Sequence, residues 1–139
     1  MPREKRKEGA PQPPPLRSEL HPMGLPVIWQ DLPPYPHTPT DRVKVEQANA
    51  LYELVAKVAD WCVSEGALFS IENPVNSWFW WCPCVARTAD LPGVFDCDFD
   101  ACNHGASRKK GSRWRTNVPE LRDLMGSCRG GHTHLPWGG

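Results

Sequence analysis

The sequence has no long apolar run and no excess of charge of one sign. No stretch of about 18 apolar residues occurs, so we expect no membrane span. Met1 is followed by charged residues and prolines instead of an apolar segment, so we expect no signal peptide. Sixteen basic residues balance sixteen acidic ones, so the overall charge does not indicate a nucleic acid or an anionic membrane as a partner. We expect an intracellular protein, without a distinction between nucleus and cytoplasm.

The sequence also has no internal repeat, and its prolines are unevenly distributed. Sixteen prolines accompany eleven glycines, and eleven of those prolines fall within the first forty residues. Proline holds φ near −65° and lacks an amide donor, so we expect a disordered, proline-rich arm over residues 1–39. The charge run at residues 3–8 is an alternative nucleic-acid patch, although two glutamates interrupt it.

A long amphipathic helix is predicted over residues 41–65. Thr40 or Asp41 can cap its start by accepting a hydrogen bond from a free backbone amide. Gly66 supplies a stop. The apolar residues follow a period close to 3.6, which places them on one face; they are Val45, Ala48, Leu51, Leu54, Val55, Val58, Ala59 and Cys62.

Short strands are predicted at residues 67–71, 94–99 and 114–117, followed by a short helix at 119–125. A helix followed closely by an apolar strand is typical of α/β proteins with a parallel sheet. Three strands are too few for a complete doubly wound sheet. We therefore expect a partial α/β domain over residues 40–126 and an irregular tail over 127–139.

Two segments of this domain carry groups suited to chemistry. Glu72 follows a predicted strand, where ligands of open α/β sheets bind, and a partly buried carboxyl group there can donate a proton. The alternative is that residues 72–74 only turn the chain, since Asn and Pro favour turns. The second segment runs from Cys102 through the basic residues 108–110 to Asn117, and its alternative is a solvated surface loop.

In their order along the chain, these segments resemble the C-terminal part of a cytosine-C5 DNA methyltransferase domain, most closely the phage-type and dinoflagellate-type relatives. That family has a Glu-Asn-Pro strand end, then a Cys-x-x-Gly turn, then a basic segment ending in Thr-Asn. The residues that match are Glu72-Asn73-Pro74, Cys102 with Gly105, Lys109-Lys110 with Ser112, and Thr116-Asn117. A linker-like segment extends the similarity to about residues 15–139.

The resemblance implies a Rossmann-like, class I methyltransferase sheet and DNA as a partner. Glu72 would then bind the ring nitrogen of a flipped-out cytosine, which makes the ring electron-poor for attack by a cysteine. S-adenosylmethionine is the methyl donor of the intact family. The residues that would contact phosphates are Arg108, Lys109, Lys110 and Arg115.

The sequence departs from this family in two respects. No Pro-Cys nucleophile motif precedes the helix, since the first cysteine is Cys62. No glycine-rich turn is present near the N-terminus to hold the methyl donor. We therefore expect a catalytically incomplete fragment, derived from a mobile element, that binds no cofactor as an isolated chain. A partial sheet leaves apolar surface uncovered, so we also expect self-association.

The aromatic run at residues 78–81 has two interpretations. A core or interface cluster is favoured, because aromatic side chains contribute much of the apolar area buried in cores and interfaces. Stacking on nucleotide bases is the alternative.

A different class of function is a small zinc-stabilised binding module. Eight thiol or imidazole groups lie within the C-terminal half, and zinc takes four such ligands in a tetrahedron. Cys128 and His132 have the most ligand-like spacing, and Cys102 and His104 are their expected partners. The tighter His132-x-His134 pair is disfavoured by its spacing. The favoured interpretation is that the cysteines are scattered reduced thiols and that no metal is bound, since six cysteines accompany no secretory signal, and the zinc site is the alternative.

Overall fold

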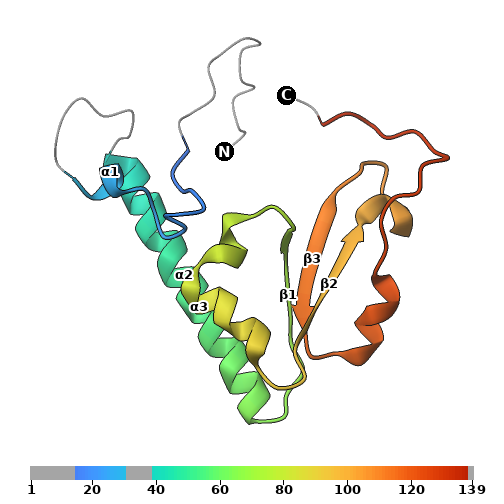
Figure 1. The fold of residues 1–139 in the computed structure, drawn as a ribbon, viewed down its shortest axis with the longest axis horizontal. Coiled ribbons are helices and arrows are strands. Elements are labelled where there is room, and N and C mark those ends of the chain that lie inside the picture. The colour runs from blue at the N-terminus through green and yellow to red at the C-terminus, as the bar shows by residue number, and fades with distance from the viewer. Residues whose placement is uncertain (1–14, 31–38, 138–139) are drawn as a thin grey trace.

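The computed structural model describes residues 15–30 and 39–137, in which a helical layer lies beside a small sheet (Figure 1). The chain is therefore a mixed helix-and-sheet protein, consistent with the predicted α/β class. Within the described ranges, no helix is long and apolar enough to cross a membrane. The elements in chain order are the α-helices and strands α1 (Pro26–Trp29), α2 (Pro39–Ser64), β1 (Ser70–Pro74), α3 (Pro83–Ala86), β2 (Phe95–Asp100) and β3 (Gly111–Thr116), with the 3-10 helices η1 (Trp78–Trp81), η2 (Arg87–Asp90), η3 (Ala101–His104) and η4 (Pro119–Leu124).

The long helix α2 forms where the 3.6-residue period predicts it, but the expectation of a single buried apolar face is wrong for Leu51, Leu54 and Val58, which are exposed. Its buried residues Val45, Ala56, Ala59 and Cys62 all point toward the rest of the chain. Asp60, near its C-terminal end, accepts two hydrogen bonds from Arg87 of η2, at 2.9 and 2.6 Å. The inner face of α2 is thus fixed both by packing and by this ion pair.

The three strands form an antiparallel sheet in the order β1–β3–β2. In this register Glu72 of β1 and Cys97 of β2 both lie opposite Trp114 of β3. The expected parallel pairing is wrong for these strands, because β3 runs against both of its neighbours. The short connection between β2 and β3, residues 101–110, suits a hairpin, whereas parallel strands need a longer crossover.

The first strand also begins later than predicted. It spans Ser70–Pro74 instead of residues 67–71, so the Glu-Asn-Pro segment lies within the strand and not after it. Leu68, predicted to be part of a buried strand, is 67% exposed. The prediction thus placed a strand on the apolar residues 67–69, which instead connect α2 to β1.

The hydrophobic core lies where η1 and α3 pack against α2 and the sheet. It consists of Phe79, Trp80, Cys82 and Val85. Trp80 is buried and its indole N–H donates to the Pro74 carbonyl at 3.0 Å. The core interpretation of the aromatic run therefore holds for residues 79 and 80, whereas the flanking indoles of Trp78 and Trp81 are exposed by 39% and 51%.

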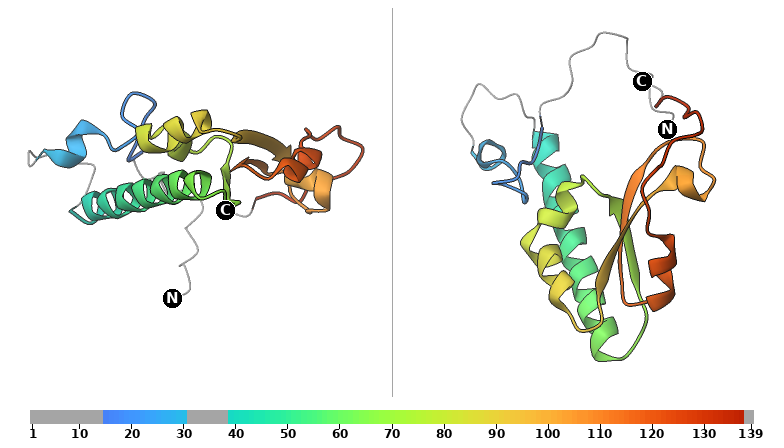
Figure 2. Two further views of the ribbon diagram at one scale, coloured as in Figure 1. Left: turned by 90° about the horizontal axis from the view of Figure 1, so that it is seen from below. Right: turned by 45° about the vertical axis from the view of Figure 1, so that its right-hand side comes forward.

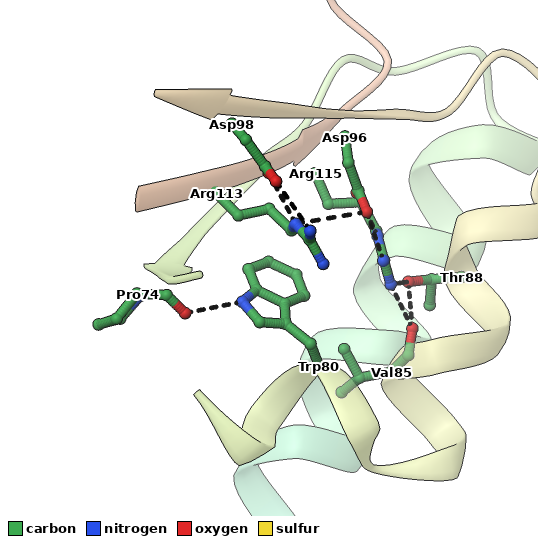
Figure 3. A network of polar contacts seen from close by, with 8 residues as sticks. All are labelled: Pro74, Trp80, Val85, Thr88, Asp96, Asp98, Arg113 and Arg115. Carbon is green, nitrogen blue, oxygen red and sulfur yellow. Dashed lines mark hydrogen bonds and ion pairs between the residues drawn. The ribbon is translucent and has the colours of Figure 1, made fainter. Parts of the chain in front are cut away.

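Two arginines of β3 join the sheet to this core (Figure 3). Arg115 is 4% exposed and lies 5.0 Å from the ring centroid of Trp80. It also donates to Asp96 through two nitrogens and to the Val85 carbonyl at 2.8 Å. Arg113 pairs in the same two-pronged way with Asp98. The layers are thus held together by charge-assisted hydrogen bonds as well as by apolar packing.

Part of the N-terminal arm is structured. Arg17 donates to the side-chain oxygen of Asn49 on α2 at 2.8 Å, and Asn49 donates in turn to the Met23 carbonyl at 2.8 Å. Ile28 of α1 is 5% exposed. The expected disorder is therefore wrong for residues 15–30, whereas the remainder of that prediction, at 1–14 and 31–38, lies outside the described residues.

Candidate metal centre

Four thiol and imidazole side chains converge at the tip of the β2–β3 hairpin. The two sulfurs of Cys102 and Cys128 and one ring nitrogen each of His132 and His134 all lie within 4.8 Å of one another. The cysteines are partly buried and the histidines exposed. Among the described residues, this is the grouping whose chemistry matches a metal site.

The hairpin tip positions Cys102. It lies in η3, directly after β2, and the Ala101 amide donates to the Lys110 carbonyl at 2.9 Å to close the tip. Gly105 ends η3 with φ of 91°, a left-handed conformation that residues with a Cβ adopt at a cost. The thiol of Cys102 is thus held at the rim of the sheet by a closed turn.

A second segment brings Cys128 to the same place. The chain leaves η4 and runs beside β2, where Gly126 and Phe99 form a parallel bridge. The Asp100 amide donates to the Gly126 carbonyl at 3.0 Å, and the Cys128 amide donates to the Asp100 carboxylate at 2.7 Å. Cys128 is therefore anchored by its backbone, although it is remote from Cys102 in sequence.

The tail then folds back over the hairpin and places both histidines beside Cys128. Gly130 and Gly131 have φ of 78° and 80°, so the chain turns sharply just after Cys128. Beyond the histidines, the Leu135 amide donates to the Ser107 carbonyl at 2.9 Å, and the Trp137 indole donates to the Lys109 carbonyl at 3.2 Å. The tail has no regular element at residues 127–137, and two hydrogen bonds just after His134 attach it to the β2–β3 loop.

The distances from the Cys128 sulfur to the two imidazole nitrogens fit a tetrahedral zinc ion. Zn–S bonds of about 2.3 Å and Zn–N bonds of about 2.0–2.1 Å give a sulfur–nitrogen edge of about 3.6 Å and a nitrogen–nitrogen edge of about 3.3 Å. The Cys128 sulfur lies 3.7 Å from Nε2 of His132 and 3.6 Å from Nε2 of His134. The two Nε2 atoms lie 2.9 Å apart, slightly closer than in such a tetrahedron.

The donor set defines the chemistry that such an ion would have. Loss of hydration, together with the neighbouring Cys128, raises the pKa of the Cys102 thiol, so metal binding would release its proton. Two thiolates and two neutral imidazoles fill a zinc coordination shell and leave no position for a reacting water. The arrangement therefore suits a structural ion and not a catalytic one.

Three of the four ligands predicted from the sequence belong to this cluster, and His104 does not. Its Nε2 lies 2.8 Å from the Leu124 carbonyl, and its ring packs edge-on against Phe99. The fourth position is taken by His134, which the sequence analysis disfavoured because of the tight His-x-His spacing. The Gly130-Gly131 turn was the available signal, since it lets both imidazoles point back toward Cys128.

The predicted DNA contacts divide into two groups. Arg115 is buried in the core and fully engaged there, so its assignment as a phosphate contact is wrong. Lys110 is half-exposed and paired with Glu72 at 3.0 Å. Lys109 is exposed, and the Arg108 guanidinium lies 5.5 Å from the Trp137 ring centroid. Two basic side chains thus remain beside the metal centre.

Glu72 lies on the exposed part of the sheet face that also carries Cys97. The register opposite Trp114 sets both residues on this face, and η4 covers its β2 side, where the Cys97 thiol donates to the Leu121 carbonyl at 3.0 Å. The Glu72 carboxylate is 42% exposed. It is therefore a solvent-facing carboxylate with one cationic neighbour.

Comparison with known proteins gives no relative for this chain. It matches no protein-family model, no curated protein and no solved structure. The metal geometry therefore carries the functional argument alone.

Proposed function

We propose that the chain is a zinc-stabilised binding module in which Cys102, Cys128, His132 and His134 hold the ion. The observation that carries this proposal is the convergence of four ligand atoms within 4.8 Å from two segments remote in sequence. Each segment is fixed by hydrogen bonds that do not involve the ligand side chains. Cysteines and histidines scattered without a role would not be expected to bring two thiols and two imidazoles, the ligand types that zinc prefers, to one place.

The zinc ion would act as a cross-link in a domain with a small core. The four main core side chains lie between α2 and the sheet, far along the chain from the tail. The tail itself contributes exposed apolar residues such as Leu135 and Trp137. Small domains with limited cores are commonly stabilised by a metal, and structural zinc contributes on the order of 10 kcal/mol to folding.

The test uses the difference between two histidines. The purified chain should contain one equivalent of zinc, and cobalt substitution should give the visible absorption of a tetrahedral thiolate site. His134→Ala should lose the bound metal, whereas the control His104→Ala should retain it, because His104 contacts Leu124 instead. Absence of zinc in the wild-type chain, or loss of zinc in the control alone, would refute the proposal.

The surface beside this centre supports single-stranded nucleic acid as the partner of the module. Trp137 is 63% exposed, the Arg108 guanidinium lies near its ring, and the Trp137 indole donates to the backbone carbonyl of Lys109, which follows Arg108. An exposed indole stacks on bases of any identity, and neighbouring cations contact phosphates. Such stacking contributes about 1–3 kcal/mol per base.

Fluorescence anisotropy with a labelled single-stranded oligonucleotide tests this partner. Trp137→Ala and Lys109→Ala should weaken binding, and added salt should weaken it further. The matched control is Trp78→Ala, which removes a 39% exposed indole from another part of the chain. Equal losses in the control and in Trp137→Ala would contradict the assignment.

A second candidate function, a fragment of a Rossmann-like cytosine methyltransferase domain, is supported by the position of β1 at an edge of the sheet that the described residues form. β1 is an edge strand, so further strands can pair beside it in a larger sheet. The exposed Glu72 carboxylate near that edge is the group that would contact a cytosine ring. The described residues do not fit S-adenosylmethionine, because none of their positive-φ glycines lies in a turn that leads from a strand directly into an α-helix. If this chain transferred labelled methyl groups to DNA, the assignment as a catalytically incomplete fragment would be wrong.

A further inference from the structure

The cluster at the hairpin tip brings two thiols together from distant parts of the chain. The sulfur atoms of Cys102 and Cys128 lie within 4.8 Å of each other. A disulfide has an S–S length of about 2.05 Å, so a shift of about 3 Å or less would join the two sulfurs. Beyond η4 the chain runs past the sheet to the hairpin tip, where η3 carries Cys102 (Figure 2). The two thiols are therefore placed to react with each other within one chain.

The backbone holds both cysteines at this place through contacts that do not involve their sulfurs. Cys102 follows the Ala101 amide, which donates to the Lys110 carbonyl at 2.9 Å and closes the hairpin tip. The Cys128 amide donates to the Asp100 carboxylate at 2.7 Å. These hydrogen bonds do not require a metal ion, so the two sulfurs stay neighbours when no ion lies between them.

Solvent reaches the pair through an open cleft of about 410 Å³, which Cys102 and His132 help to line. A small oxidant such as hydrogen peroxide can therefore approach the sulfurs. Cys84 is partly buried and lies outside the cluster. The remaining three cysteines are buried: Cys62, Cys82 and Cys97. Among the six cysteines, this pair thus combines access to solvent with a neighbouring thiol in the same cluster.

We propose that Cys102 and Cys128 are a redox switch for the zinc site, an inference that rests on the proposed function. As thiolates they bind the ion, and as a disulfide they release it. Hydrogen peroxide oxidises one thiol to a sulfenic acid and is itself reduced to water. The second thiol then attacks the oxidised sulfur, which forms the S–S bond and expels a second water molecule. Two thiols and one peroxide thus give one disulfide and two waters.

Zinc and the disulfide exclude each other at this site. A metal ligand must be a thiolate, and neither sulfur of a disulfide is one. Oxidation leaves only His132 and His134, two of the four ligands that a structural zinc ion needs. Bound zinc in turn occupies both sulfurs and protects them from the oxidant. The redox state of the pair therefore decides whether the tail is cross-linked to the hairpin through the metal.

Peroxide treatment of the zinc-loaded, full-length chain tests the switch. Hydrogen peroxide should release the bound zinc, which a coloured chelator reads, and mass spectrometry of unreduced peptides should find a Cys102–Cys128 disulfide that forms at the same rate. Dithiothreitol followed by zinc should restore the loaded chain. In a separate sample, excess zinc added before the peroxide should slow disulfide formation, because it shortens the time that the thiols spend without an ion.

The matched control is Cys84→Ser, which removes a partly buried cysteine outside the cluster. This variant should release zinc and form the disulfide at the wild-type rate. Zinc retained after peroxide treatment, a sulfinic acid in place of the disulfide, or a disulfide between two chains would overturn the switch and leave the zinc site standing. A wild-type chain purified without zinc would overturn both proposals.

Discussion

Arg115 donates two hydrogen bonds to Asp96, at 2.7 and 2.9 Å, although its side chain is only 4% exposed. The same guanidinium donates to the Val85 carbonyl and to the Thr88 hydroxyl, which lie on the helical side of the core. A charge taken this far from water is stable only when paired and hydrogen-bonded. The Arg115–Asp96 pair therefore connects the sheet to the helical side of the core (Figure 3).

Removing the buried cation should destabilise the fold strongly. Arg115→Met removes both hydrogen bonds to Asp96, leaves it only the 3.6 Å ion pair with Arg113, and should lower the free energy of unfolding by about 3–5 kcal/mol. Arg113→Met is the control, because its partner Asp98 is 45% exposed and can be hydrated, so its cost should be smaller. Urea denaturation of the zinc-loaded variants measures both. Equal losses of unfolding free energy in the two variants would show that the burial of the arginine does not determine the cost of removing it.

The sequence predicted the elements whose pattern is local. The apolar period of α2 gave its position to within about two residues at each end. The alternation of apolar and polar residues located β2 closely, at Phe95–Asp100. Both patterns are repeats along the local sequence, and in α2 the repeat located the helix although Leu51, Leu54 and Val58 are exposed.

Strand direction and the buried arginine were not predictable in the same way. A helix followed by a strand occurs in parallel and antiparallel sheets alike, so the pattern did not fix how β1 pairs. Arg115 lies in a basic segment that resembles a surface loop, and its burial depends on Asp96 being opposite it in β2. Pairing between strands is a tertiary property that the local sequence does not display.

The alternative zinc site inferred from the sequence shares three of its four residues with the cluster in the structure. Cys102, Cys128 and His132 were identified from ligand type and spacing. His104 was chosen over His134 because the His132-x-His134 spacing is tight. The fold reverses this choice, since the glycine turn at 130–131 returns the tail to the hairpin while His104 points to Leu124.

Stability should decline at alkaline pH through the buried thiol of Cys97. Burial raises the pKa of this thiol above its ordinary value of 9.0. Its stabilising contribution is therefore fully present below pH 9.0 and is lost as the pH rises through the folded-state pKa. Cys97→Ser keeps a donor for the Leu121 carbonyl and removes the ionisation, so its free energy of unfolding should fall less steeply above pH 9.0. If the unfolding free energy of Cys97→Ser fell with pH as steeply as that of the wild-type chain, the Cys97 thiol would not be the cause of the decline.

Thiol labelling should separate metal-bound cysteines from free ones of similar exposure. Cys84, Cys102 and Cys128 are all partly buried. In the zinc-loaded chain Cys84 should react with iodoacetamide, whereas Cys102 and Cys128 should be protected because their thiolates are coordinated. Mass spectrometry of peptides from a short labelling pulse reads this out. Equal modification of Cys84 and Cys128 would show that the thiols are free.

X-ray absorption at the zinc edge tests the central claim most directly, because it counts the atoms bound to the ion. The proposed ligands, Cys102, Cys128, His132 and His134, predict two sulfurs at about 2.3 Å and two nitrogens at about 2.0–2.1 Å. His134→Ala should remove one of the two nitrogens or abolish binding. A shell of three or more sulfurs, or one of oxygen and nitrogen alone, would contradict the account.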